Sequence, residues 1–412
     1  MSANLVWHRN TLPNGLTVLE YPRQSSNTAQ ISLAVKYGSN QEPKEAAGIA
    51  HFLEHMLAGG SEQRIQRSRS IENYGGILDF YTDREHVLAT IDVLPEKLSE
   101  ASRILSELFF GDTFEKDKFE LERKIILNEL AEVEDDPSVK VDQMLLESLF
   151  KNHPIRRPVG GYPRTIKQVE LNQIKQAQLV NYVPPNMILT LSGKLPQKAL
   201  EETIQGFQNQ PKGNALPEEK QATETHKPKP CVVGEKAGIR QTYLSIGART
   251  ISATHKDAPA LDLIATLLSG GTSSRLFIEL REKNAVTYDV SSTHCKGADF
   301  GYFSVNCAVN NSKVDKARKL ILKELAALGN EDICADELER TKQIWLGSLL
   351  RGMDSIHDTL EIITYMETQF RSEFALRDYV AKIKALKKED IRQAASRHLN
   401  EDSLCTALLT PK

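Results

Sequence analysis

The amino-acid sequence predicts an α+β protein with two homologous domains, each a mainly antiparallel sheet packed with helices. Its 412 residues are too many for one hydrophobic core, which indicates two or more domains. Runs that alternate apolar and polar residues, typical of strands, occur between segments with helical periodicity. Residues 260–271 repeat the pattern of residues 49–60, which indicates an internal duplication.

Composition and charge narrow the classes of function. The formal net charge of −3 offers no basic surface for nucleic acid and no polybasic patch for a membrane. No apolar run approaches the ~18 residues needed to span a bilayer, and the first residues lack the pattern of a signal peptide. The five cysteines include no CxxC pair, which favours free thiols in a reducing compartment. We therefore expect a cytoplasmic protein that binds neither nucleic acid nor membrane.

Strands and helices are expected to alternate along the first half of the chain. Alternation and β-branched residues predict the strands, and apolar periodicity ended by glycine or proline predicts the helices. The expected strands are residues 16–21, 29–37, 77–82, 86–94 and 187–192, and the expected helices are residues 48–57, 68–74, 95–110 and 115–133.

The segment from Gly48 to Leu57 predicts a buried helix that carries three polar side chains. His51 and His55 lie one turn apart on the same face, and Glu54 can reach the same spot. Two imidazoles and a carboxylate in apolar surroundings suit a catalytic zinc site, with two nitrogen ligands and a base for water. The alternative is that both histidines are ordinary core residues, because this five-residue pattern also arises by chance.

A third ligand is expected on the acid-rich helix at residues 115–133. At about 100° per residue, Glu122 and Glu129 fall in the sector that holds the apolar side chains Phe119, Ile125, Ile126, Leu130 and Val133. An ionised carboxylate on a buried face is costly unless it is paired or bound to a metal. Glu129 is therefore the expected third ligand, and Glu122 is expected to orient a histidine. The alternative is that both glutamates pair with an arginine.

A polar, proline-rich stretch divides the chain. Residues 209–230 contain almost no aliphatic side chains and are expected to form a semi-extended linker between domains at residues 1–208 and 231–412. The second copy keeps the apolar positions of the first, but the three polar positions of the first helix become Asp262, Ala265 and Thr266. The fold therefore does not need those polar residues, which favours a functional role for them in the first copy.

Together these motifs resemble those of the pitrilysin/insulinase superfamily of zinc metallopeptidases. The resemblance covers nearly the whole chain and is greatest for the branch that includes mitochondrial processing peptidase subunits and bacterial homologues. It rests on the inverted zinc motif His51-Phe-Leu-Glu-His55, Gly38-Ser with Glu42, Tyr74-Gly-Gly, Glu122-Arg with Glu129, and the degenerate second domain. The resemblance implies one zinc ion (Zn2+) per chain, bound by His51, His55 and Glu129, with Glu54 as the base.

The same resemblance draws attention to Arg281 and Tyr288 in the second half. In the family, an arginine and a tyrosine at this spacing face the zinc of the opposing half of the enzyme. The resemblance implies that Tyr288 stabilises the oxyanion of the transition state and that Arg281 positions the substrate. The alternatives are a surface ion pair for Arg281 and half-buried packing for Tyr288.

The chain departs from the family at the strand that follows Gly75-Gly76. Asp79, Phe80 and Tyr81 stand where the family usually has Asn-Ala before an aromatic residue. In the family, the substrate backbone pairs with this strand edge. The resemblance therefore implies that these three residues contact the substrate and that Asp79 and Phe80 reshape or narrow the site.

The expected function is zinc-dependent hydrolysis of peptides or unfolded polypeptide segments inside a chamber formed by a dimer. One chain carries both the zinc residues and the arginine–tyrosine pair, so a homodimer would be complete; a heterodimer with a related chain is the other arrangement. The alternative function is that of a non-catalytic or partner-dependent subunit of a processing peptidase or another assembly.

Overall fold

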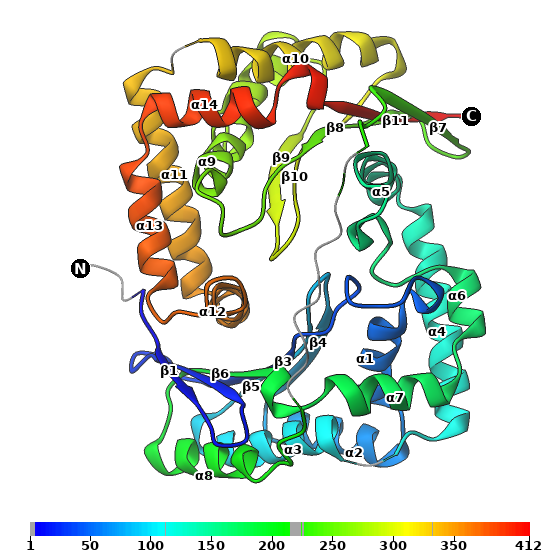
Figure 1. Ribbon diagram of the computed structural model, residues 1–412, viewed down its shortest axis with the longest axis vertical. Helices are drawn as coiled ribbons and strands as arrows, with labels where there is room; N and C mark the ends of the chain where they lie inside the picture. The colour runs from blue at the N-terminus through cyan, green and yellow to red at the C-terminus, as the bar shows by residue number, and fades with distance from the viewer. Residues whose placement is uncertain (1–4, 112, 215–223, 225, 332) are drawn as a thin grey trace. The chain divides into compact units, whose positions relative to one another are not determined.

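The computed structural model describes residues 5–111, 113–214, 224, 226–331 and 333–412. Its contacts divide the chain into two compact units. Unit 1 comprises Met1–Ala131, Arg157–Lys220 and Gly352–Leu376, and unit 2 comprises Glu132–Arg156, Gln221–Arg351 and Arg377–Lys412. Each unit combines a mixed sheet with helices, which confirms the predicted α+β class (Figure 1).

The sheet of unit 1 has six strands in the order β1-β2-β6-β3-β5-β4. β2 and β6 are parallel, and the other neighbouring strands are antiparallel. β3 and β6 lie at the centre and are buried along their whole length, as expected for strands covered on both faces. The strands are β1 His8–Thr11, β2 Thr17–Pro22, β3 Ala29–Val35, β4 Ile77–Thr82, β5 Val87–Val93 and β6 Met187–Gly193.

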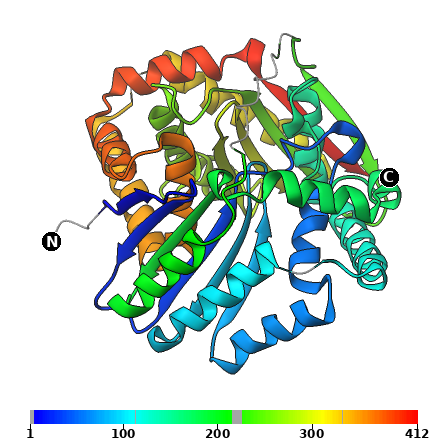
Figure 2. The same ribbon diagram turned by 60° about the horizontal axis from the view of Figure 1, so that its bottom comes forward.

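Three helices run side by side across one face of this sheet, as Figure 2 shows. α3 packs between α8 and α2, and it contacts β3 and β5 through buried residues at helical spacing. Among the described residues, no helix combines the length and the apolar character that a membrane span requires. The helices in the first half that belong to unit 1 wholly or mostly are α1 Ile49–Gly59, α2 Glu62–Asn73, α3 Leu98–Phe110, α4 Lys116–Asp135, α6 Pro163–Gln168, α7 Leu171–Asn181 and α8 Gln197–Gln208.

The other face of this sheet is covered by α12, Ile356–Phe370, which comes from late in the chain (Figure 1). The hydroxyl groups of Thr364 and Thr190 lie 3.0 Å apart, which ties α12 to β6. The guanidinium of Arg9 donates to the carboxylate of Glu367 at 3.0 Å, and this carboxylate is almost fully buried. α12 is therefore an integral part of unit 1.

The sheet of unit 2 repeats the topology of the first. Its order is β7-β11-β8-β10-β9, with one parallel pair between β7 and β11, and it corresponds strand by strand to β2-β6-β3-β5-β4. This shared order supports the internal duplication. The strands are β7 Cys231–Lys236, β8 Thr242–Arg249, β9 Val290–Lys296, β10 Gly301–Val309 and β11 Cys405–Pro411, and the helices are α5 Pro137–Leu149, α9 Ala258–Ser269, α10 Val314–Asn330, α11 Ala335–Asp354, α13 Ala375–Ala385 and α14 Lys388–His398.

Each unit contains one helix from the other half of the sequence. α12 completes unit 1, and α5 packs on β8 and β11 of unit 2 through Val141, Leu145 and Leu149. The compact units therefore differ from the contiguous division that we expected, because helices pack on whichever sheet buries their apolar face. Residues 215–223 and 225 of the expected linker lie outside the described residues.

The elements of the first half agree with the predicted ones, with three differences. The strand β1 was not expected. Helix α2 begins six residues earlier than residue 68, because the side chain of Ser61 caps the helix by accepting a hydrogen bond from the Arg64 N–H. The apolar sector of α4 is narrower than predicted: Ile125 and Val133 are 37% and 45% exposed. The buried residues of α4 are Phe119 and Ile126, and the Phe119 ring stacks on that of Phe52 in α1 at 4.8 Å.

Candidate metal centre

Helix α1 begins at a turn that requires glycine. Gly48 has a φ of 98°, and a Cβ atom there would lie 2.5 Å from the carbonyl oxygen of Gly160. Most apolar residues of α1 are buried, whereas His51, Glu54 and His55 are partly exposed. The helix thus presents the three polar side chains together, as the sequence predicts.

The carboxylate of Glu42 anchors the first turn of α1. It accepts hydrogen bonds from the backbone N–H groups of Gly48 at 2.8 Å and Ala50 at 2.7 Å. Arg157 donates to the carbonyl oxygens of Ser39 and Glu42, at 3.1 and 2.9 Å, which fixes the preceding loop. Burial raises the pKa of Glu42 to about 8, although the two N–H donors and Arg157 favour its charged form.

Replacing Glu42 with alanine is expected to lower the free energy of unfolding by about 3 kcal/mol, because two buried N–H groups lose their acceptor. Urea denaturation of the two proteins measures the difference. The matched control is Glu45→Ala, because Glu45 is exposed nearby; a change within about 0.5 kcal/mol is expected there. Equal losses in both variants would contradict the anchoring role of Glu42.

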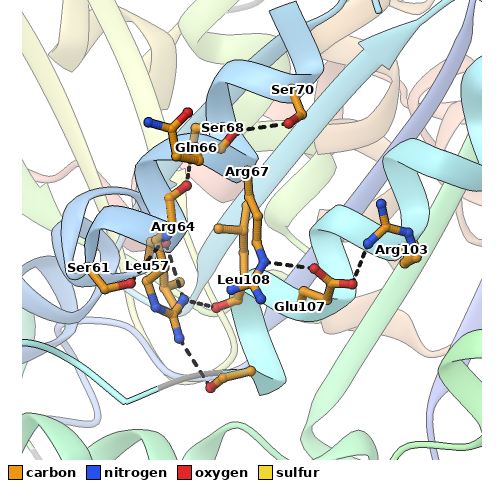
Figure 3. A network of polar contacts seen from close by, with 11 residues as sticks. Leu57, Ser61, Arg64, Gln66, Arg67, Ser68, Ser70, Arg103, Glu107 and Leu108 are labelled. Atoms are coloured by element: carbon orange, nitrogen blue, oxygen red, sulfur yellow. Dashed lines mark hydrogen bonds and ion pairs between the residues drawn. The ribbon is translucent and has the colours of Figure 1, made fainter. Parts of the chain in front are cut away.

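The other end of α1 is held by Arg64 of α2, a fully buried residue (Figure 3). Its guanidinium donates to the carbonyl oxygens of Leu57, Leu108 and Gly111. These carbonyl groups lie at the C-terminal ends of α1 and α3, where the helix dipole favours a cation. The sequence analysis missed Arg64, because α2 is polar and nothing in the local pattern distinguishes a buried arginine from an exposed one.

The structure brings together the three predicted metal ligands. The rings of His51 and His55 are 4.7 Å apart between centroids and nearly perpendicular, at 81°. Oε2 of Glu129, on α4, lies 3.3 Å from Nε2 of His55 and 3.9 Å from Nε2 of His51. One ligand atom from each residue lies within 4.8 Å of the others. This convergence is what a small cation needs.

Glu122 sets the direction in which His55 can bind a cation. Its Oε2 lies 3.0 Å from Nδ1 of His55, so this nitrogen carries the proton and donates it. The lone pair on Nε2 then faces the Glu129 carboxylate at 3.3 Å. Two acceptors at this distance need a proton or a cation between them. Burial alone would lower the pKa of His55, but Glu122 and Glu129 raise it.

His51 is suited to a neutral ligand role. Burial, with a smaller contribution from His55, lowers the pKa of His51 to about 4, so its imidazole is uncharged near neutral pH. A metal-binding histidine must be unprotonated at the ligating nitrogen. Two imidazole nitrogens and one carboxylate oxygen, with Glu122 supporting one imidazole, are a donor set that fits zinc with an open fourth position.

Glu54 lies beside this group without belonging to it. Its Oε2 accepts a hydrogen bond from the hydroxyl of Thr82, on β4, at 2.5 Å. Burial raises the pKa of Glu54, and Thr82 and His55 only partly oppose this shift. A cavity of about 470 Å³ opens next to Glu54, and Phe80, Ile65 and Arg69 contribute to its lining. A carboxylate of raised pKa at the wall of a cavity can serve as a general base.

Asp79, Phe80 and Tyr81 lie on β4, an edge strand of the sheet in unit 1. Asp79 and Tyr81 point to the exposed face of the strand, and Tyr81 is 55% exposed. Phe80 points to the other face and packs against the core of unit 1 while also lining the cavity. Asp79 and Tyr81 therefore lie on one face of β4 and Phe80 on the other, and the contact of these residues with a substrate stays a prediction.

Comparison with known proteins identifies the family. Residues 17–162 match the insulinase family (peptidase family M16), and residues 168–344 match the peptidase M16 inactive domain. The chain belongs to the pitrilysin/insulinase superfamily. This confirms the resemblance seen in the sequence.

The similarity to M16 proteins extends over the whole chain. A Bacillus subtilis protein named an uncharacterized zinc protease is 25% identical over 98% of this chain and 98% of its own. A protein of the same description from Mycobacterium tuberculosis is 27% identical, over 100% of this chain and 94% of its own. The crystal structure of a protease from Helicobacter pylori superposes with a TM-score of 0.89 at 23% identity, covering 98% and 99% of the two chains.

Arg281 and Tyr288, singled out by the M16 motif, lie together in unit 2. The guanidinium of Arg281 stacks over the Tyr288 ring at 4.4 Å and donates to the Tyr288 carbonyl oxygen at 3.3 Å. The side chain of Tyr288 is 80% exposed, so it is not the half-buried packing residue of the alternative. A cavity of about 370 Å³ adjoins it, with Asp142 and Asp289 in its lining.

In the second copy of the M16 fold, Asp262 occupies the position of His51. Its carboxylate binds the ammonium group of Lys296 at 2.6 and 2.8 Å, the Tyr379 hydroxyl at 2.6 Å and Nδ1 of His294 at 2.7 Å. Burial lowers the pKa of His294, so this imidazole is neutral and donates from Nδ1. Burial would raise the pKa of Asp262, but Lys296 and His294 lower it. An internal ion cluster thus replaces the metal ligands.

A second histidine-containing group in this M16 protein is of a different kind. His255, Asp257 and His398 also bring three ligand atoms within 4.8 Å. However, Oδ2 of Asp257 already pairs with Nε2 of His398 at 2.9 Å and with the guanidinium of Arg397 at 3.3 Å. Arg397 supplies the positive charge, so we interpret this group as a salt-bridge network between α9 and α14.

Proposed function

We propose that the chain is a zinc-dependent endopeptidase that hydrolyses peptides or unfolded polypeptide segments in the cytoplasm. The observation that carries the proposal is the convergence of His51, His55 and Glu129 on one point, with Glu54 beside it at the wall of a cavity. The names of the zinc-protease relatives agree with this function.

His51, His55 and Glu129 would hold one zinc ion per chain. When bound, zinc acts as a Lewis acid that makes water more acidic and polarises a carbonyl group. Glu122 keeps Nδ1 of His55 protonated and its ring oriented. Glu54 accepts the proton of the attacking water and returns it to the leaving amine, which suits a carboxylate whose pKa burial has raised.

The remaining roles fall to Arg281, Tyr288 and the residues of β4. Tyr288 donates its phenolic hydrogen to the developing oxyanion, and Arg281 positions the substrate. The substrate backbone pairs with the edge strand β4 near Asp79, Phe80 and Tyr81. We propose a homodimer in which Arg281 and Tyr288 of one chain serve the zinc site of the partner; a heterodimer with a related chain is the other arrangement.

The metal and the activity are tested together. Metal analysis of the purified protein should find one zinc per chain, and a chelator should abolish turnover of a fluorogenic peptide library until zinc is restored. A protein that binds zinc yet cleaves no peptide in any oligomeric state would overturn the enzymatic proposal.

Mixing two inactive variants tests the homodimer. An Arg281→Ala/Tyr288→Phe chain and a Glu54→Gln chain should recover about a quarter of wild-type activity, because half of the dimers are mixed and each has one intact site. The control is each variant mixed with itself. No recovery in verified mixed dimers would show that the pair acts within its own chain.

The second candidate function is that of a non-catalytic or partner-dependent subunit. The observation that favours this second candidate is the match of residues 168–344 to the peptidase M16 inactive domain. The two candidates differ in one measurement: a partner-dependent subunit would show no turnover alone but would gain it when a related chain is added.

A further inference from the structure

Tyr288 is supported by a stack of side chains from a π-helix. The segment η5, Phe277–Lys283, is a π-helix that carries both Phe277 and Arg281. The guanidinium of Arg281 lies 4.8 Å from the centroid of the Phe277 ring and 4.4 Å from that of the Tyr288 ring. Arginine stacks favourably on aromatic faces. Arg281 is therefore in contact with two aromatic rings, that of Phe277 at the start of η5 and that of Tyr288 beyond its end.

The backbone around Tyr288 is held by hydrogen bonds, whereas its phenolic hydroxyl is held by none among the described residues. In the turn between η5 and β9, the Val286 N–H donates to the Leu280 carbonyl oxygen at 2.7 Å, and Lys313 donates to the Ala285 carbonyl oxygen at 2.6 Å. Ala285 has a φ of 47°, a left-handed conformation that alanine rarely adopts. By contrast, the phenol of Tyr288 makes no hydrogen bond within the part of the chain that the structure describes.

We propose that Phe277 is a positioning residue that acts through Arg281 to hold the ring of Tyr288 in a fixed orientation. The catalytic importance of that orientation rests on the proposed function. An 80% exposed ring with no bond at its hydroxyl would otherwise adopt several rotamers. Phe277 limits the positions of the guanidinium, and the guanidinium limits those of the ring. π-Helical turns of this kind often occur at functional sites.

A fluorine label tests the orientation directly. 3-Fluorotyrosine at position 288 of the full-length protein is followed by ¹⁹F NMR in wild type, Phe277→Leu and Phe277→Tyr. The Leu variant should move the resonance toward that of free 3-fluorotyrosine, and the Tyr variant should keep it near the wild-type position. Lys283→Ala is the control, because Lys283 belongs to the same turn but pairs with Glu279. An unchanged resonance in Phe277→Leu overturns the proposal.

Kinetics give the second readout. In Phe277→Leu, kcat should fall by about tenfold to a hundredfold, the effect of misplacing a group that acts in the transition state, while KM changes little. Phe277→Tyr should restore kcat. If Phe277→Leu does not fold, Phe277→Met provides the same comparison. If the chain cleaves no peptide at all, the proposed function fails, but the ¹⁹F result still decides whether Phe277 orients Tyr288.

Discussion

Replacing Glu54 with glutamine is expected to reduce peptide turnover by about 10²–10⁴-fold, the range that a positioned general base contributes. Glutamine has nearly the same shape and can still accept the hydrogen bond that Thr82 donates to Glu54, so the fold should persist. It cannot take a proton from water. The measurement is kcat for a fluorogenic peptide at saturating zinc.

Measuring the bound zinc distinguishes a loss of the general base from damage to the metal site. Glu54→Gln should keep one zinc per chain, because the converging ligand atoms belong to His51, His55 and Glu129. His55→Ala should lose both zinc and turnover. Glu120→Gln, an exposed change on α4, should leave both unchanged. Near-wild-type turnover in Glu54→Gln would remove Glu54 from the mechanism.

Replacing Asp262 with alanine is expected to lower the free energy of unfolding by about 3–5 kcal/mol, the cost of leaving a buried charge without its partner. Lys296 would lose its carboxylate, and Tyr379 and His294 would each lose an acceptor. Urea denaturation of wild type and variant measures the loss. Asp336→Ala, on the exposed first turn of α11, is the matched control and should change stability by less than about 0.5 kcal/mol.

The difference in stability between wild type and Asp262→Ala is also expected to depend on pH. The pKa of Asp262 is lower in the folded chain than in the unfolded chain, where it is about 3.9. A lowered folded-state pKa contributes stability that is present above the unfolded pKa and is lost as pH falls through the folded pKa. The difference between wild type and Asp262→Ala should therefore stay constant from pH 7 to about pH 4 and shrink below that. A difference that grows with acid would contradict this role.

The sequence alone predicts the centre of the site because local spacing determines it. His51 and His55 share one face of α1, and Glu122 and Glu129 share one face of α4, by helical geometry. The cost of burying a carboxylate applies to Glu122, whose side chain is 12% exposed, more than to Glu129, whose side chain is 43% exposed. The contacts of Arg64, and the hydrogen bond between Thr82 and Glu54, join segments distant in sequence. No periodicity carries that information.

The fold was predictable to a similar extent. Alternation of apolar and polar residues predicts the strands, and the repeat predicts two similar sheets. The amphipathic character of α5 and α12 shows that each has a face to bury, but not which sheet receives it. Ile125 on α4 is exposed for the same reason. Periodicity shows which face of the helix is apolar, but tertiary contacts decide how much of that face is covered.

The late position of α12 in the sequence affects how unit 1 folds during translation. The sheet it covers is complete once β6 has emerged, yet Thr190 and the other residues beneath α12 stay uncovered until residues 356–370 have been translated. At about 5–20 residues per second, this interval lasts for seconds, during which this face of the sheet is not yet covered by α12. We therefore expect unit 1 to reach its full stability only after α12 has been made, although its sheet can form much earlier.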